Sequence, residues 1–424
     1  MLTWTKISVL LIVLTGLFSL IHCDDSQYRY NRIYRLRVPE EYIQVFAEAL
    51  QNGEADGKYD ILHMTRRSSD FTDVMVKRSS LRDFKKLIQE FNVEAFITDH
   101  DVERSIKLFK RANQRAAART RVRRSTNTLP THKMYISFHE MEAALKTFDR
   151  LYEHASLEEI GKTVENRSLW LLKISQDTSL PIVWIDAGIH AREWIAPATA
   201  FYLIDKLLSK DGCELLSKFQ FYIAPNVNPD GYVFSHIRNR LWRKNRNKTE
   251  HENCLGVDLN RNFPYKWGLS GSSGNPCSDI YRGSSAADQV ETQSIIKKLT
   301  AIAPQTKLFI TLHSYGQLIL IPFGYLPAKR PDNYNELKRI SIKVIFKLWK
   351  HHNTVYSSGT AADILYSAAG GSDDFARGDL KIPYSYTIEL PDLGSYNFLL
   401  PPSFIIPVGN QIWDALQTFV GQMK

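Results

Sequence analysis

The chain has 424 residues, which is long enough for two or three domains. Its hydrophobic content of 44% and aromatic content of 12% exclude a largely disordered protein and are typical of a globular protein with a packed core. The formal net charge is +9, and residues 24–124 carry +5 of it, so the positive charge is concentrated early in the chain.

The first 23 residues have the pattern of a secretory signal peptide. Lys6 precedes an apolar stretch at residues 7–21, and Cys23 is a small residue before two aspartates. The apolar stretch is too short to span a membrane comfortably, and no other uninterrupted apolar stretch follows. We therefore expect a secreted, extracellular protein without a membrane span.

Residues 24–103 form the next predicted unit. The segments YRLRVP and DVMVKR alternate like strands, whereas EEYIQVFAEAL and SLRDFKKLIQEFN have apolar residues at helical spacing. Strands and helices in this order predict a small α+β domain.

A basic segment at residues 104–124 follows, with nine basic residues and no acidic ones. Its first part has a helical pattern, whereas its end, ARTRVRRS, has too few apolar residues to bury and is expected to be exposed. Proteolysis concentrates at exposed polar segments between domains, so we expect a trypsin-like protease to cleave near Arg124. The alternatives are a solvated linker and a site for nucleic acid or heparin. No recognition motif accompanies the segment, and we expect no nucleic-acid partner.

Residues 125–424 form the largest predicted unit. Near-continuous apolar strand candidates (LPIVWIDA, FQFYIAP, TKLFITLH, YSYTIEL) alternate with helical stretches. Such strands between helices indicate an α/β sheet that is covered on both faces.

Ionisable residues follow three of these strand candidates. His190 and Glu193 come after the first, His313 after the third, and Glu389 after the fourth. In open α/β sheets ligands bind beyond the carboxyl ends of the strands, so we expect these side chains to share one crevice. Two imidazoles and a carboxylate are the ligand set of a catalytic zinc, and a separate carboxylate is needed to move the water's proton. Asp258 is expected either to orient a histidine ligand or to cap a loop.

The order of short motifs along this unit resembles one known family. The motifs are HARE (190–193), NVNPDGY (226–232), LWRKNR (241–246), GVDLNRNF (256–263), LHSYGQ (312–317), GGSDD (370–374) and TIEL (387–390). Together they resemble the pancreatic-type zinc metallocarboxypeptidases, which include carboxypeptidases A and B, and the first domain resembles the family's activation segment. The resemblance implies a zymogen that binds one zinc ion and acts as a monomer on the C-termini of peptides or proteins. It also implies a mixed twisted sheet with helices on both faces, preceded by the small α+β activation domain.

The same resemblance assigns roles to residues of this chain. His190, Glu193 and His313 are expected to bind zinc, Glu389 to act as general base and acid, and Arg243 to stabilise the oxyanion. Asn260 and Arg261 are expected to bind the substrate's terminal carboxylate, and Tyr366 to close over it. Arg192, Ser314 and Tyr315 are expected to line the path of the peptide.

Asp373 falls on the position that sets specificity within the family. An acid there resembles the B type, which releases C-terminal Lys or Arg, because an unpaired buried carboxylate favours a cationic partner. A-type or mixed specificity and an inactive peptide-binding relative are the alternatives. Pro391 stands where many relatives carry arginine, which affects the loop after Glu389.

Four cysteines are present, and Cys23 is expected to leave with the signal peptide. Cys254 and Cys277 flank a Gly/Ser-rich loop and are the expected disulfide in an oxidising compartment. Cys213 is then left as an odd thiol.

Overall fold

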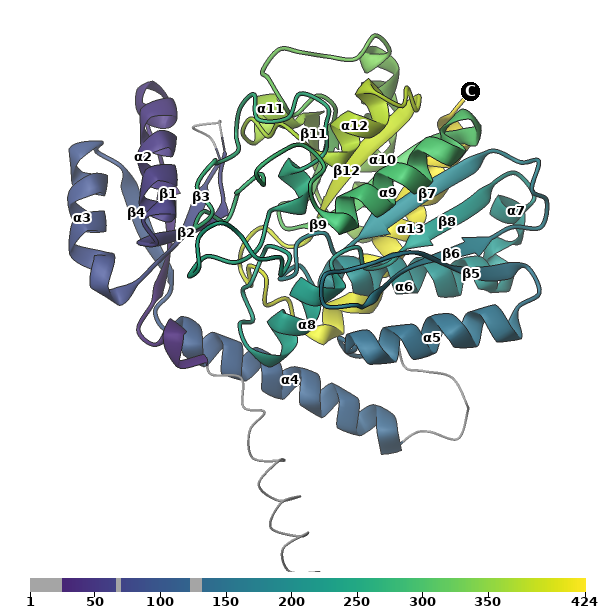
Figure 1. Ribbon diagram of the computed structural model, residues 1–424, viewed down its shortest axis with the longest axis horizontal. Coiled ribbons are helices and arrows are strands. Elements are labelled where there is room, and N and C mark those ends of the chain that lie inside the picture. Colours follow the sequence, from purple (N-terminus) through teal and green to yellow (C-terminus); the bar gives the residue numbers. More distant parts are fainter. Residues whose placement is uncertain (1–24, 66–69, 123–131) are drawn as a thin grey trace, which may run out of the picture.

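The computed structural model describes residues 25–65, 70–122 and 132–424 (Figure 1). The chain forms two units, and each matches the fold class expected from the sequence. The predicted signal peptide at residues 1–23 and the predicted cleavage point at Arg124 lie outside the described residues.

The first unit is a four-stranded antiparallel sheet in the order β2-β3-β1-β4. Tyr34 and Val74 pack against its two helices, whereas Ile33 and Met75, one position along, join the core of the second unit. The strand period of two therefore gives this sheet one face for its own core and one face for docking. Its elements are β1 (Arg32–Arg37), α2 (Ile43–Ala55), β2 (Tyr59–His63), β3 (Thr72–Val76), α3 (Leu81–Glu90) and β4 (Glu94–Asp99).

One helix, α4 (Val102–Val122), connects the two units and lies along the second one (Figure 1). The boundary predicted at residue 103 therefore falls inside a helix, because the helical pattern runs on through the basic segment. Phe109 anchors the helix, since its ring lies 5.6 Å from the Tyr135 ring and 5.4 Å from the Trp194 ring. The guanidinium of Arg240, which is fully buried, lies over the Phe109 ring.

The second unit is built on an eight-stranded mixed sheet in the order β11-β10-β12-β9-β7-β8-β6-β5. Strands β8, β7, β9 and β12 run parallel to one another, and every residue of β7 is buried. The strands are β5 (Ala155–Lys162), β6 (Ser168–Ile174), β7 (Ile182–Ala187), β8 (Gln220–Ala224), β9 (Thr306–Ser314), β10 (Leu318–Ile321), β11 (Ser357–Thr360) and β12 (Tyr384–Leu390).

Helices cover both faces of this sheet, as the apolar strands predicted. In β7, Val183 and Ile185 pack on one side, where α5, α6, α10 and α13 lie, and Trp184 packs on the other, where α9 and α12 lie. The helices are α5 (Phe138–Leu151), α6 (Ile195–Leu208), α7 (Cys213–Leu216), α8 (Pro229–Ile237), α9 (Val290–Ile302), α10 (Tyr334–His352), α11 (Ala361–Ile364), α12 (Ser372–Gly378) and α13 (Ile405–Gln422). None of the helices in the described ranges is long and apolar enough to cross a membrane.

Candidate active site

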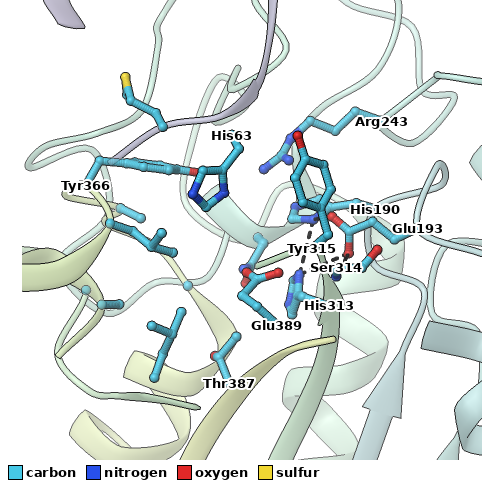
Figure 2. Close-up of a pocket in the computed structure, with 18 of the residues that line it drawn as sticks. His63, His190, Glu193, Arg243, His313, Ser314, Tyr315, Tyr366, Thr387 and Glu389 are labelled. Atoms are coloured by element: carbon cyan, nitrogen blue, oxygen red, sulfur yellow. Dashed lines mark hydrogen bonds and ion pairs between the residues drawn. The ribbon is translucent and has the colours of Figure 1, made fainter. Parts of the chain in front are cut away.

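The ends of three parallel strands bring the predicted site residues together (Figure 2). The chain turns after β7 at Gly188, whose φ of 71° is the left-handed region that glycine adopts without strain, and then presents His190 and Glu193. His313 lies near the end of β9, and Glu389 lies directly beside it in the register of β12. The parallel pairing of these strands is therefore what places all four side chains at one edge of the sheet.

The Nδ1 atoms of two histidines and the carboxylate oxygens of a glutamate face one another. The Nδ1 atom of His190 lies 2.8 Å from a carboxylate oxygen of Glu193 and 3.2 Å from Nδ1 of His313. The second Glu193 oxygen lies 3.3 Å from Nδ1 of His313, and all three side chains are buried. Two imidazole nitrogens and a carboxylate facing one another in a buried site are satisfied when a cation lies between them.

The outer nitrogens of both histidines have partners that fix the tautomer. Nε2 of His190 lies 3.2 Å from Asp258, and Nε2 of His313 lies 3.2 Å from the Thr311 hydroxyl. A proton on each Nε2 leaves the Nδ1 lone pair free for a metal ion. The residues present therefore fit a single zinc ion with three protein ligands.

Asp258 fulfils both roles that its sequence position suggested. One of its oxygens accepts from His190 and from the backbone N–H of Asn260, at 2.9 Å, which caps the turn. The other accepts two hydrogen bonds from Arg243, at 3.1 and 2.8 Å. Burial by itself raises the pKa of Asp258, but Arg243 and His190 hold that pKa well below its usual range. Asp258 is therefore a fixed negative charge behind the metal ligands.

The buried carboxyl of Glu389 lines the same cavity but does not belong to the metal-ligand group. Burial raises the pKa of Glu389 to about 8, although the nearby His313 favours its charged form. A carboxyl group with a pKa near neutrality is able both to accept and to donate a proton.

Arg261 and Tyr366 form the next wall of the cavity. Arg261 donates to the backbone carbonyls of Gly271 and Asn260, both at 2.9 Å, and its second terminal nitrogen lies 3.4 Å from the Tyr366 hydroxyl. The side-chain oxygen of Asn260 accepts the backbone N–H of Ser372 at 3.0 Å. These bonds orient a guanidinium and an amide next to the ring of Tyr366.

Asp373 lies at the start of α12 and also lines the cavity. It is 7% exposed, and none of the ion pairs among the described residues involves it. Its neighbour Asp374 has a different role, because its carboxylate accepts the backbone N–H groups of Gly324 and Tyr325 at 2.8 to 3.0 Å. Burial raises the pKa of Asp373.

The cavity brings together nearly every residue that the sequence predicted for the site. Arg192 is the exception and lies outside its lining. The predicted residues that line the cavity are His190, Glu193, Arg243, Asn260, Arg261, His313, Ser314, Tyr315, Tyr366, Asp373 and Glu389.

The first domain reaches into this cavity with residues that the sequence did not identify. Leu62 and His63, at the end of β2, and Met64, which follows it, line the cavity. Figure 2 shows His63 beside the catalytic residues. The imidazole of His63 stacks on the ring of Tyr315 with centroids 5.7 Å apart. An ordinary strand pattern precedes these residues, so their position depends on how the two units dock.

Two of the predicted peptide-binding residues are held by the first domain. Arg192 is 1% exposed, and it donates to both oxygens of Asp60, at 2.9 and 3.1 Å, instead of facing the cavity. The hydroxyl of Tyr315 donates to Asp73 at 2.9 Å. Two polar groups that were predicted to receive a peptide are thus already bonded to the domain that covers the site.

Comparison with known proteins agrees with this geometry. Residues 141–415 match the family model for zinc carboxypeptidases, and residues 44–108 match the model for the carboxypeptidase activation peptide. The chain belongs to the zinc carboxypeptidase family. It is a zinc carboxypeptidase zymogen whose first domain is the activation peptide, as the sequence motifs predicted.

Similar proteins carry both A-type and B-type names. Carboxypeptidase A2 of Mus musculus is 34% identical over 97% of this chain and 98% of its own length. Carboxypeptidase B of Astacus astacus is 38% identical over 68% of this chain and 97% of its own length. Crystal structures of thrombin activatable fibrinolysis inhibitor and of carboxypeptidase A from Helicoverpa armigera cover 93% and 95% of this chain, with TM-scores of 0.80 and 0.83 at 28% and 26% identity. The matched regions span 99% and 98% of those two solved chains, respectively.

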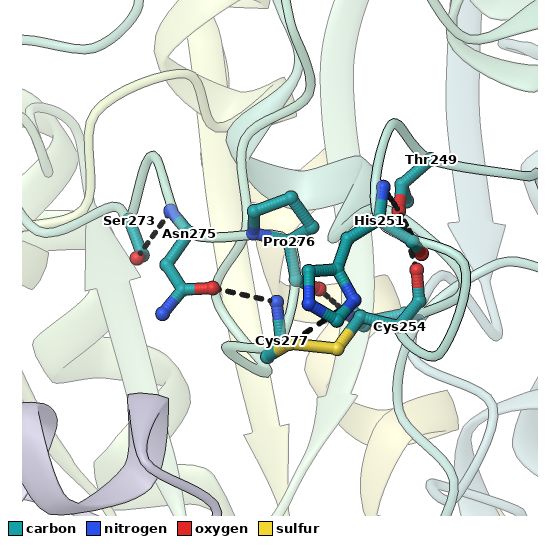
Figure 3. Close-up of a disulfide and its surroundings, with 8 residues drawn as sticks. Thr249, His251, Cys254, Ser273, Asn275, Pro276 and Cys277 are labelled. Atoms are coloured by element: carbon teal, nitrogen blue, oxygen red, sulfur yellow. Dashed lines mark hydrogen bonds between the residues drawn. A yellow bond between two sulfur atoms is a disulfide. The ribbon is translucent and has the colours of Figure 1, made fainter.

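The loop that carries Asp258, Asn260 and Arg261 is closed by the expected disulfide between Cys254 and Cys277 (Figure 3). Asn275 supports the second cysteine, because its side-chain oxygen accepts the Cys277 N–H at 2.9 Å. Cys213, the remaining described cysteine, is exposed and forms no disulfide.

Replacing both Cys254 and Cys277 with serine is expected to lower the free energy of unfolding by about 3 kcal/mol, because the bond closes a loop of 23 residues. Urea denaturation measures this difference. Cys213→Ser is the control and is expected to change the stability by no more than about 0.5 kcal/mol. Equal loss in both proteins would contradict a role of the disulfide in holding this loop.

Asp60→Asn is expected to weaken inhibition by the activation domain. Of the two carboxylates that pair with the buried guanidinium of Arg192, only Asp279, 3.8 Å away, then remains. Peptidase activity of the uncleaved variant should rise about tenfold or more, since breaking a buried pair costs several kcal/mol. Asp56→Asn, at an exposed position of the same domain, is the control. If the uncleaved Asp60 variant is as inactive as the parent protein, the pair does not hold the domain in place.

Proposed function

We propose that the protein is a secreted carboxypeptidase that removes C-terminal Lys or Arg from peptides and proteins. The observation that carries this proposal is the buried carboxylate of Asp373, which lines the cavity of the zinc ligands and has no ion pair among the described residues. A cationic side chain is the partner that such a carboxylate lacks, because a buried charge without one is costly. The small residues Gly324 and Ala361, which also line the cavity, leave room for a long side chain.

His190, Glu193 and His313 would hold the zinc ion. When bound, zinc polarises the scissile carbonyl and makes a water molecule more acidic. Glu389 accepts the proton of the attacking water and donates it to the departing amine. Arg243, held by Asp258, offers its positive charge to the carbonyl oxygen as negative charge develops there.

The remaining residues position the substrate. Asn260 and Arg261 bind the terminal carboxylate, for which a guanidinium and an amide supply matched donors. The ring of Tyr366 closes over the terminal residue, and Ser314 and Tyr315 lie along the approach of the peptide. Arg192 joins this approach only after Asp60 has left with the activation domain.

We further propose that a trypsin-like protease activates the zymogen near Arg124 and releases residues 125–424. This proposal is supported by the position of the basic residues of α4, which follow the activation domain directly in the chain. The predicted signal peptide at residues 1–23 supports secretion.

Glu389→Gln and His190→Ala are expected to separate proton transfer from metal binding. The Glu389 variant should retain zinc but lose about a factor of 1,000 in kcat, because a positioned acid–base group contributes about that much. The His190 variant should lose both zinc and activity, since one of three ligands is gone. Metal analysis and hydrolysis of a peptide by the activated protein measure the two effects. Full activity of the Glu389 variant would rule out its proposed role.

Asp373→Asn is expected to change the preferred C-terminal residue. Release of Arg from a peptide should fall about 100-fold or more, while release of Phe from the matched peptide stays constant or rises. Asp379→Asn, at an exposed position just after α12, is the matched control and should leave the ratio unchanged. If the parent enzyme releases Phe faster than Arg, the protein has A-type specificity. If no activated form hydrolyses any peptide, it is a binding protein instead.

A further inference from the structure

Helix α10 exposes a ridge of large apolar side chains that the enzyme mechanism does not use. Ile342, Phe346 and Trp349 are 53%, 58% and 52% exposed. They recur at intervals of four and three residues, which places them on one side of the helix. No other helix in the described part of the chain exposes three large apolar side chains, and Trp349 is the only exposed tryptophan there.

The opposite side of the same helix already accounts for its packing. Its buried face contacts α13, β10 and β11, and Figure 1 places the helix in the catalytic domain, away from the activation domain. The buried residues are Leu337, Ile340, Ser341, Val344 and Leu348. The exposed ridge therefore adds nothing to the core. Within the ridge, the rings of Phe346 and Trp349 pack on each other with centroids 5.8 Å apart.

A basic stripe runs alongside this ridge. Arg339, Lys343 and Lys350 are exposed, lie at intervals of four and seven residues, and have no ion pair among the described residues. The side chains of Arg339 and Lys343 reach only the neutral Gln422, at 3.3 and 2.5 Å. Their positive charge is therefore not compensated by the protein.

Acidic groups near the helix offset only part of this charge. Glu336 accepts the hydroxyl of neutral Tyr384 at 3.0 Å and keeps its own negative charge. Asp414 on α13 lies 3.6 Å from Lys347 and accepts from His351 and His352 at 2.9 and 3.0 Å. The surface that remains beside the ridge is cationic.

We propose that this face of α10 binds the surface of a membrane that contains anionic lipids. An exposed ridge with tryptophan and phenylalanine enters the boundary between headgroups and acyl chains, while adjacent lysines and arginines contact the negative headgroups. A protein partner of standard size needs a much larger patch than three side chains on a convex helix. A soluble polyanion such as heparin uses the basic stripe but has no need of the apolar ridge.

The uncleaved zymogen without the predicted signal peptide, residues 24–424, tests this proposal by co-sedimentation with vesicles. Binding to vesicles of phosphatidylserine and phosphatidylcholine in equal parts should be about tenfold tighter, or more, than binding to phosphatidylcholine alone. Added salt should reduce this preference, because the lipid charges are screened.

Two pairs of substitutions separate the ridge from the stripe. Phe346→Ser with Trp349→Ser should reduce binding to both kinds of vesicle, whereas Lys343→Glu with Lys350→Glu should abolish the preference for anionic lipid. The matched controls are Leu151→Ser with Leu269→Ser, at apolar positions 60% and 57% exposed, and Lys297→Glu with Lys307→Glu, at exposed lysines elsewhere. All four proteins should keep peptidase activity on a small soluble peptide after activation, which verifies their fold.

Three kinds of result would overturn the proposal. One is the absence of a specific effect, either equal binding to the two kinds of vesicle or equal losses in the controls. Another is binding to heparin that persists in the Phe346/Trp349 variant while vesicles are not bound, which would assign the stripe to a soluble polyanion. The third is a dimer in sedimentation velocity that this variant abolishes, without vesicle binding, which would assign the ridge to self-association.

Discussion

The buried carboxylate of Asp258 is the interaction on which the rest of the site depends. It fixes the tautomer of a metal ligand, holds Arg243 with two hydrogen bonds and caps the turn that carries Asn260 and Arg261. A single negative charge thereby aligns three groups whose proposed partners are a metal ion, a developing oxyanion and a substrate carboxylate. In a site shielded from water such fixed charges act at full strength, and no reorganisation is needed when substrate arrives. The disulfide between Cys254 and Cys277 holds the loop in which this carboxylate lies.

The activation domain binds two other polar groups of the predicted peptide path, Arg192 and Tyr315. Buried Arg192 and Tyr315 need partners, because a buried group without one carries a desolvation penalty, and Asp60 and Asp73 supply them. The alternation of β1 and β3 gives the domain its second, docking face without weakening its own core. The contacts by which the domain covers the site are therefore the same contacts that bond Arg192 and Tyr315. Removal of the domain breaks them together.

In the catalytic domain, different sides of one strand or helix can have different contacts, as β7 and α10 show. Strand β7 packs helices on both faces and presents the metal ligands from its carboxyl end. Helix α10 contributes one side to the core and leaves the other, apolar and basic, facing outward. Part of the net positive charge therefore lies on one exposed face of α10, in Arg339, Lys343 and Lys350.

The fold class, the metal-ligand set and the strands whose ends carry it could be predicted from the sequence, because buried strands and short motifs are local patterns. The sequence also identified Cys254 and Cys277 as a pair from the loop between them. Residues far apart in sequence decided the rest. Only the docking of two domains shows that Arg192 binds Asp60 and that His63 stacks on Tyr315. Likewise, periodicity marks the apolar residues of α10 but does not say which of them stay exposed, since burial is set by what packs against a helix and not by its own sequence.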